Sequence, residues 1–177
     1  IPLLMLEFGS DYFHLGLVVT VFSYAFGLGA LPAGYLADKI GPRRLITLFL
    51  FGAGILALGV WPMTSLIHYG ILMAGIGLFC STYHPSSNTL ISLGIREKGR
   101  AFGIHGIAGS LGVAVVPLLS AWFGTAWGWR MPHQFYGLIG IVAGFYSLTI
   151  PKYQERKKEE AASTRANAPK PLSYFNL

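Results

Sequence analysis

Charge is scarce in this sequence, and acidic residues are absent from its long apolar stretches. Only 11% of its 177 residues are charged, whereas 53% are hydrophobic. A soluble domain carries roughly 25% charged residues. A chain with so little charge cannot cover a water-facing surface, so we expect it to lie in a lipid bilayer. Cys80 is the single cysteine, which excludes a disulfide within the chain and a metal site built from cysteines.

The basic residues outnumber the acidic ones and give the sequence a net charge of +6. A basic chain can bind nucleic acid through a stripe of cations interleaved with aromatic residues. Here the cations gather at the ends of apolar stretches instead, as they do in membrane proteins. We therefore expect the lipid bilayer as a partner and no binding of nucleic acid.

Five apolar stretches are long enough to cross a bilayer as helices, which takes roughly 17–25 residues each. They cover residues 15–36, 45–61, 71–93, 102–123 and 133–150, and none contains an aspartate or glutamate. The sequence begins at Ile1 without a methionine, and residues 1–6 are too short for a signal peptide or a complete span. We interpret them as the end of a truncated first helix. The predicted fold is an all-α integral membrane bundle over residues 1–151.

The composition changes abruptly after Pro151. Residues 152–177 are rich in lysine, arginine, glutamate, alanine and serine. They offer no apolar face wide enough for a core, so we expect a solvated cytoplasmic linker. A surface helix from Tyr153 to Ala162 is equally compatible with the spacing of its glutamates and lysines.

The distribution of cations predicts how the helices are oriented. Positively charged residues concentrate in short cytoplasmic loops. Loops 37–44 and 94–101 and the tail 152–177 hold every lysine and arginine except Arg130. Four tryptophans suited to a membrane interface fall at the opposite ends of the stretches: Trp61, Trp122, Trp127 and Trp129. We expect a multi-pass protein of the cytoplasmic (inner) membrane, with these loops and the tail cytoplasmic.

Residues 34–44 join the first two complete stretches and read Gly-Tyr-Leu-Ala-Asp-Lys-Ile-Gly-Pro-Arg-Arg. Gly41 permits a positive φ and Pro42 cannot continue the preceding helix, so a tight turn is predicted there. Asp38 falls at the C-terminus of that helix, where the macrodipole disfavours a carboxylate by roughly 0.3–1 kcal/mol. We expect nearby cations to hold it: Lys39, Arg43 and Arg44.

This segment resembles the loop between the second and third helices of major facilitator superfamily transporters, whose pattern is Gly-x-Leu-x-Asp-Arg/Lys-x-Gly-x-Arg-Arg/Lys. The matching residues are Gly34, Leu36, Asp38, Lys39, Gly41, Arg43 and Arg44. The resemblance implies the amino-terminal six-helix half of a transporter, whose carboxy-terminal half is absent here. It implies secondary active transport of a small molecule by alternating access, with Asp38 and Arg43 acting as a cytoplasmic gate latch. The alternative for this loop is an ordinary basic turn.

The fourth apolar stretch carries the most polar segment within the predicted membrane, from Cys80 to Thr89. At helical spacing its polar residues share one face, and Pro85 frees a backbone carbonyl beside that face. Transporter sites are built near the bilayer midplane from such groups. The predicted cavity residues are Ser81, Tyr83, His84, Ser87 and Asn88. Alternatively, the hydroxyls bond between helices and His84 is structural.

The residues Tyr83 to Ser87 also resemble a fourth-helix segment of fosmidomycin-resistance-type efflux proteins. With no carboxylate inside a span, His84 is one candidate for proton coupling, because its reference pKa suits a proton step. The other is a carboxylate outside this sequence. His105, near the cytoplasmic end of the next stretch, is interpreted as an interfacial or packing residue.

Small residues four apart predict close helix packing in lipid. The pairs Gly106 with Ser110 and Ala108 with Gly112 lie in the stretch 102–123. We expect this helix to be part of a tightly packed bundle.

Three function classes remain to be compared. A transporter half leads, and a non-transporting membrane scaffold or assembly subunit with the same fold is the alternative. An enzyme or haem protein is disfavoured because no His-x-x-x-His pair, phosphate loop or acidic residue beside an intramembrane serine is present. We expect no cofactor and no metal.

Overall fold

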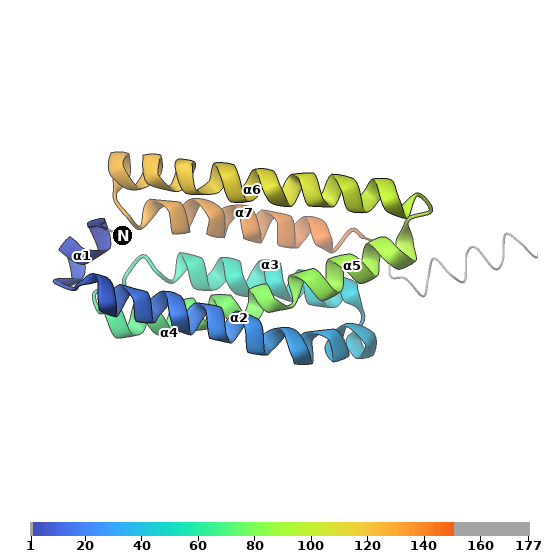
Figure 1. Ribbon diagram of the computed structural model, residues 1–177, viewed down its shortest axis with the longest axis horizontal. Helices are drawn as coiled ribbons and strands as arrows, with labels where there is room; N and C mark the ends of the chain where they lie inside the picture. Colours follow the sequence, from blue (N-terminus) through green and yellow to red (C-terminus); the bar gives the residue numbers. More distant parts are fainter. Residues whose placement is uncertain (1, 151–177) are drawn as a thin grey trace, which may run out of the picture.

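The structure is a computed structural model that describes residues 2–150. Within that range it contains helices and no strand, in agreement with the predicted all-α fold. The seven helices are α1 (Pro2–Phe8), α2 (Tyr12–Ile40), α3 (Pro42–Leu58), α4 (Leu66–Ser81), α5 (Tyr83–Gly94), α6 (Lys98–Trp127) and α7 (Met131–Ser147) (Figure 1). The predicted linker at 152–177 lies outside the described residues.

Three helical segments are long and apolar enough to cross a membrane: α2, the continuous segment Leu66–Gly94 that combines α4 and α5, and α6. α3 and α7 have 17 residues each, which corresponds to about 25 Å of helix. All five coincide with predicted spans, and the two shorter ones lie at the lower limit of the length required. The division into a bundle at 1–151 and a linker stays a prediction.

The exposed surface of the described chain is strongly apolar. Large hydrophobic side chains such as Leu31, Val113 and Leu6 are about four-fifths exposed. A water-soluble protein rarely exposes such a surface over its whole length. The arrangement is that of helices whose outer faces contact lipid.

The helices pack mainly in two pairs, α2 with α4 and α3 with α7. In Figure 1, α2 and α4 run along one side of the molecule, α6 and α7 along the other, and α3 and α5 lie between them. The α2–α3 turn, the α5–α6 connection and the end of α7 gather at one end. This is the end that carries the basic segments, so the loops predicted to be cytoplasmic lie together.

Glycines bring the helices of each pair into backbone contact. A Cβ on Gly77 of α4 would lie 2.5 Å from the carbonyl oxygen of Phe22 in α2. A Cβ on Gly137 of α7 would lie 3.0 Å from the carbonyl oxygen of Gly54 in α3, and one on Gly140 would lie 3.2 Å from that of Leu50. Only glycine allows the helices to approach this closely.

The α3–α7 pair is also held at both ends by side chains that cap the partner helix. The Gln134 amide, near the start of α7, donates to the carbonyls of Ala57 and Leu58 at the end of α3. At the other end, the Arg43 guanidinium donates to the carbonyls of Ser147 and Leu148. Carbonyls in the last turn of a helix lack a partner within the regular helix, and each helix of the pair donates side-chain hydrogen bonds to such carbonyls of the other.

The small residues of α6 do not pack as predicted. A Cβ added at Gly103, Gly106, Gly109 or Gly112 would meet nothing within 4 Å among the described residues. α6 packs sparsely, on α7 and α5. The expectation of close packing from Gly106–Ser110 and Ala108–Gly112 is therefore wrong for the described chain, because no neighbouring backbone lies against that face.

One of the four interfacial tryptophans is instead part of the core. Trp61, Trp122 and Trp127 are more than half exposed, as an interfacial belt requires, but Trp129 is 9% exposed. Its ring packs against Phe8 and Tyr69, at centroid distances of 5.4 and 5.5 Å. The predicted exposure of Trp129 is thus wrong, because α1 and α4 cover it.

Candidate functional site

The predicted tight turn between the first two complete spans is confirmed, and it consists of a single residue. Gly41 has φ +89° and ψ 144°, between the end of α2 at Ile40 and the start of α3 at Pro42. A positive φ is readily available only to glycine. Pro42 occupies the first position of α3, where its missing N–H costs nothing because that position has no helical partner.

The expected cluster of cations around Asp38 is wrong. Asp38 lies in the last turn of α2 and is exposed, and no ion pair within 4 Å links it to Lys39, Arg43 or Arg44. The Lys39 ammonium lies 5.4 Å from the centre of the Tyr35 ring instead. The three cations point to other partners or to the surface, which leaves the Asp38 carboxylate accessible.

Arg43 is held by α7 and not by the neighbouring acid. Its Nε lies 3.4 Å from the carbonyl oxygen of Ser147, and its Nη2 donates to the carbonyl of Leu148. Beside it, the hydroxyls of Thr47 and Ser147 are 2.8 Å apart. A cation is favoured at a helix C-terminus because the carbonyls there are unpaired and the macrodipole is negative. Arg44 is exposed, and Gly34 has open space where a Cβ would lie.

The polar segment of the fourth span is interrupted where a kink was predicted. α4 ends at Ser81 and α5 begins at Tyr83, with Thr82 between them. The Thr82 N–H bonds to the Phe79 carbonyl, and the Thr82 hydroxyl donates to the same oxygen at 2.8 Å. Pro85 supplies no N–H for a carbonyl one turn earlier, which accounts for the break.

The residues of the predicted polar face differ in exposure. Ser81 and Ser87 are 2% and 7% exposed, whereas His84 and Asn88 are exposed. The break at Thr82 does not account for this difference, because Ser87, His84 and Asn88 all lie on α5. A shared polar face of these residues stays a prediction.

The buried hydroxyls bond within their own helices. Ser81 donates to the Leu78 carbonyl at 2.6 Å, and Ser87 donates to the His84 carbonyl at 3.2 Å. The longest-range hydroxyl contact of the segment joins Thr82 to the Leu45 carbonyl at 3.5 Å. Bonds to a residue's own helix satisfy these groups without holding a ligand, so Ser81 and Ser87 are positioned for packing. Their proposed place in the cavity stays a prediction.

The ring of Tyr83 packs against the rings of two histidines, His84 and His105. Its ring centroid lies 5.2 Å from that of His84 and 5.8 Å from that of His105 on α6. Phe49 of α3 packs against it at 5.2 Å. His105, interpreted from the sequence as an interfacial or packing residue, thus packs on the ring next to His84. His84 and Asn88 lie one helical turn apart and are the exposed polar residues of this region.

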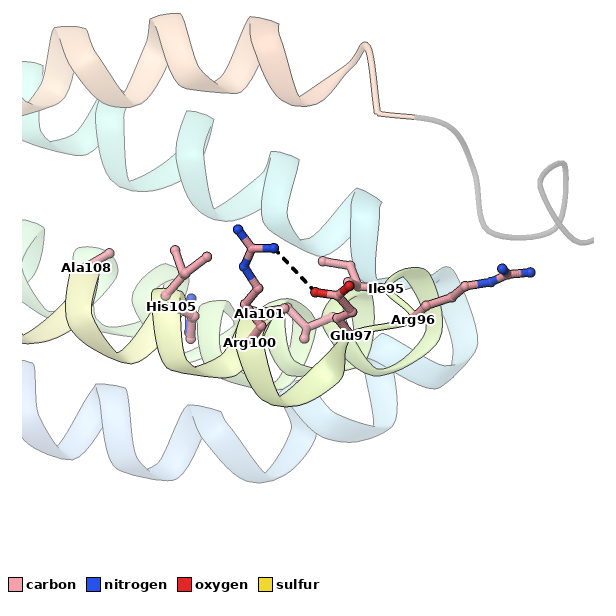
Figure 2. Close-up of a pocket in the computed structure, with 9 residues that line it drawn as sticks. Ile95, Arg96, Glu97, Arg100, Ala101, His105 and Ala108 are labelled. Atoms are coloured by element: carbon pink, nitrogen blue, oxygen red, sulfur yellow. Dashed lines mark hydrogen bonds and ion pairs between the residues drawn. The ribbon is translucent and has the colours of Figure 1, made fainter.

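A cleft of 670 Å³ begins beside His105 and extends toward the basic end of the molecule (Figure 2). Its walls are the end of α5, the connection to α6 and the first turns of α6. The lining residues are Ile91, Ile95, Arg96, Glu97, Arg100, Ala101, Ile104, His105 and Ala108. Small-molecule sites have volumes of about 300–1,000 Å³, so the cleft has the size of a ligand site.

At the opposite end, an ion pair joins α1 to the start of α7. Arg130 Nη2 lies 2.8 Å from Glu7 Oε1 and donates to the Met63 carbonyl at 2.5 Å. The Arg130 guanidinium also lies 4.3 Å from the centre of the Trp129 ring. The hydrogen bond from Arg130 holds the pKa of Glu7 below its ordinary value of 4.5. The sequence carried a signal for this contact, because Arg130 is the lone cation at that end and Glu7 is an acid at the same end.

His133 extends this outer cluster. Its Nδ1 lies 3.3 Å from the Trp129 carbonyl, and its Nε2 lies 3.2 Å from the Tyr69 hydroxyl. A carbonyl can only accept, so Nδ1 carries the proton and Nε2 accepts from Tyr69 in the neutral ring. The hydrogen bond from Tyr69 connects α4 to α7.

The packed apolar helices, the basic turn between α2 and α3 and the polar break within a span define a multi-pass helical membrane protein. The family model described as Major Facilitator Superfamily matches residues 1–175. This chain belongs to that family, and the resemblance inferred from residues 34–44 is confirmed.

Curated relatives agree with this assignment. The chain is 30% identical to the probable L-galactonate transporter of Escherichia coli (strain K12), over 87% of this chain and 34% of that protein. It is 30% identical to an uncharacterized MFS-type transporter of Bacillus subtilis (strain 168), over 76% of this chain and 34% of that protein. It is 24% identical to a probable galactarate/D-glucarate transporter of Escherichia coli (strain K12), over 81% of this chain and 34% of that protein.

The chain therefore spans about a third of the length of these relatives. All three are named as transporters and none as an enzyme, which supports the non-enzyme interpretation. The resemblance to the fosmidomycin-resistance branch stays a prediction.

Proposed function

We propose that this chain is the amino-terminal half of a secondary active transporter that moves a small organic anion across the inner membrane by alternating access. The match to the superfamily over residues 1–175 is the observation that carries the proposal. The chain covers about a third of its relatives, which is consistent with a second half supplied by the rest of a longer protein. The anion follows from the relatives named for galactonate, galactarate and D-glucarate, which are all carboxylates.

The turn at residues 34–44 is the proposed gate. The Asp38 carboxylate is exposed at the end of α2, without an ion pair to the three nearby cations. Arg43 holds the end of α7. We infer that Asp38 contacts a group outside the described residues in one state of the cycle and releases it in the other, while Arg43 keeps its own half together.

His84 is the proposed substrate and proton-coupling residue, with Tyr83 and Asn88 beside it. His84 is exposed in the described chain, and its ring is stacked edge-on against Tyr83. Ionisable residues at membrane depth generally face a cavity or the interior of a bundle. A carboxylate elsewhere in the complete protein is the alternative for proton coupling.

The proposal is tested by flux through the full-length gene product in proteoliposomes or cells. His84→Ala should lower flux strongly, whereas His68→Ala, at the exposed outer start of α4, should not. Asp38→Asn should lower flux without lowering the amount of protein in the membrane. Asp11→Asn is the matched control, because asparagine still caps α2 and removes the same charge.

Three outcomes would change the proposal. Full flux in His84→Ala removes the site assignment, and full flux in Asp38→Asn reduces residues 34–44 to an ordinary basic turn. A wild-type protein that assembles with partners and moves no substrate would favour the alternative, a membrane scaffold with a transporter-like fold.

A further inference from the structure

We propose that the cleft between α5 and α6 is an entry site for an amphipathic organic anion, in which Arg100 binds the charged group and an isoleucine-rich wall binds the hydrocarbon part. This inference rests on the proposed function and adds a second site to it, nearer the cytoplasm than His84.

The charges at the cleft favour an anion. Arg100 Nη1 lies 3.4 Å from Glu97 Oε2, and the two side chains are 76% and 72% exposed. An exposed pair at this distance contributes little, so an incoming carboxylate can replace Glu97 at the guanidinium. Figure 2 shows Arg100 and Glu97 pointing toward each other, while Arg96 extends away from the other labelled side chains. Arg100 is therefore the cation that a ligand in the cleft would contact.

Five of the nine residues that line the cleft are apolar. Ile91 and Ile95 line it from α5 and the connection, and Ala101, Ile104 and Ala108 line it from α6. These side chains offer no hydrogen bonds to the hydroxyls of a sugar acid, and burying an unpaired hydroxyl is unfavourable. A hydrocarbon or aromatic portion beside the carboxylate fits this apolar wall better than a fully hydroxylated chain does.

The inner end of the cleft lies near the proposed substrate site. His105 lines the cleft, and its ring lies 5.8 Å from that of Tyr83, which in turn lies 5.2 Å from that of His84. A ligand held at Arg100 is thus separated from His84 by two adjoining aromatic rings. These ring contacts place the cleft close to His84, and this proximity is the ground for proposing an entry site there.

The test is calorimetric titration of the full chain in phosphatidylcholine nanodiscs, with empty nanodiscs subtracted. Three probes separate the two requirements: benzoate has a carboxylate and an apolar ring, gluconate has a carboxylate and hydroxyls, and benzyl alcohol has the ring without the charge. Benzoate should bind at one site per chain. Gluconate and benzyl alcohol should each bind at least about tenfold more weakly.

Matched variants locate the site. Arg100→Gln should weaken benzoate binding about tenfold. Lys98→Gln is the control, because Lys98 carries the same charge two residues away and does not line the cleft. It should change benzoate binding less than about twofold. Arg100→Lys should retain most of the affinity if charge is what matters. Ile104→Ser should weaken binding, and Ile107→Ser should not, although the two isoleucines are 60% and 63% exposed.

The results can overturn this inference without affecting the proposed function. Absence of benzoate binding, equal binding of gluconate, or equal effects of Arg100→Gln and Lys98→Gln would each refute the entry site, whether or not the full-length protein transports. Benzoate binding with the expected variant pattern and no flux of any anion would refute the transport proposal and leave the cleft as a binding site. Circular dichroism of each variant confirms that it is folded.

Discussion

α6 and α7 are both rich in glycine, and they use it in opposite ways. The glycines of α7 lie against α3, where Gly137 and Gly140 leave room for the carbonyls of Gly54 and Leu50. A Cβ added at Gly99, Gly103, Gly106, Gly109 or Gly112 of α6 would meet no atom within 4 Å among the described residues, and only at Gly124, near the end of α6, would it contact a side chain, that of Leu3 at 3.6 Å. The same composition therefore belongs to a fixed helix pair in one case and to an open surface in the other.

The difference lies in the neighbours and not in the glycines themselves. α7 is capped at its end by Arg43 and caps α3 through Gln134, so its position along α3 is fixed at both ends. α6 has sparse contacts with α7 and α5. Close approach in lipid requires small residues on a helix and also a partner backbone opposite them.

The largest effect is expected from Gly137→Leu. The added side chain would collide with the Gly54 carbonyl and with the Leu58 side chain, whose nearest carbons lie 3.1 Å from the position of a Cβ. Overpacking of this kind costs about 3 kcal/mol, and the thermal midpoint of the chain in nanodiscs should fall markedly. An unchanged midpoint would show that α3 and α7 are not in backbone contact.

Removal of the Arg43 cap should have an intermediate effect. Arg43→Gln loses the guanidinium that donates to the Ser147 and Leu148 carbonyls, and should destabilise the chain by about 1–2 kcal/mol. Arg44→Gln is the control, since it removes the same charge from the next, exposed position. Hydrogen exchange at the end of α7 reports the effect locally, and equal exchange in the two variants would contradict it.

The Glu7–Arg130 pair should give a smaller, pH-dependent effect at the outer end of α7. The pKa of Glu7 is lowered by the hydrogen bond from Arg130. The pair therefore stabilises the folded chain fully above pH 4.5, and this contribution is lost as the pH falls through the lower, folded-state pKa. Glu7→Gln should remove that dependence from the thermal midpoint, whereas Glu97→Gln should retain it.

The smallest effect is expected from Gly109→Leu on α6. Nothing described lies within 4 Å of the position of its Cβ, so the stability of this chain should change by no more than about 0.5 kcal/mol. Comparison of its thermal midpoint with that of Gly137→Leu tests the contrast directly. A loss as large as that of Gly137→Leu would show that α6 is packed as closely as α7.

The sequence predicted the helices well, because their signals are local. Apolar length defined the five spans, and Gly41 followed by Pro42 defined the turn. Partners across the bundle were harder to predict. Asp38 precedes three cations in sequence, but Arg43 is turned toward α7, which is about a hundred residues away. The pattern of charges along one segment does not show which carbonyls of a distant helix will lie next to it.

The candidate site was predicted in part for the same reason. The break beside Pro85 follows from proline chemistry, and it occurs at Thr82. Helical spacing did not predict that Ser81 and Ser87 are buried while His84 and Asn88 are exposed, because burial depends on which helices pack against each side. The proximity of His105 to Tyr83 depends on how α6 is placed beside α5, and no spacing within either segment determines it.

The one-residue turn at Gly41 restricts how the two helix pairs can move. α2 is bound to α4 and α3 is bound to α7, and Gly41 alone separates α2 from α3. So short a link leaves no slack for one pair to slide along the other at this end. At this end of the bundle, relative motion of α2 and α3 is therefore limited to rotation about the backbone of Gly41.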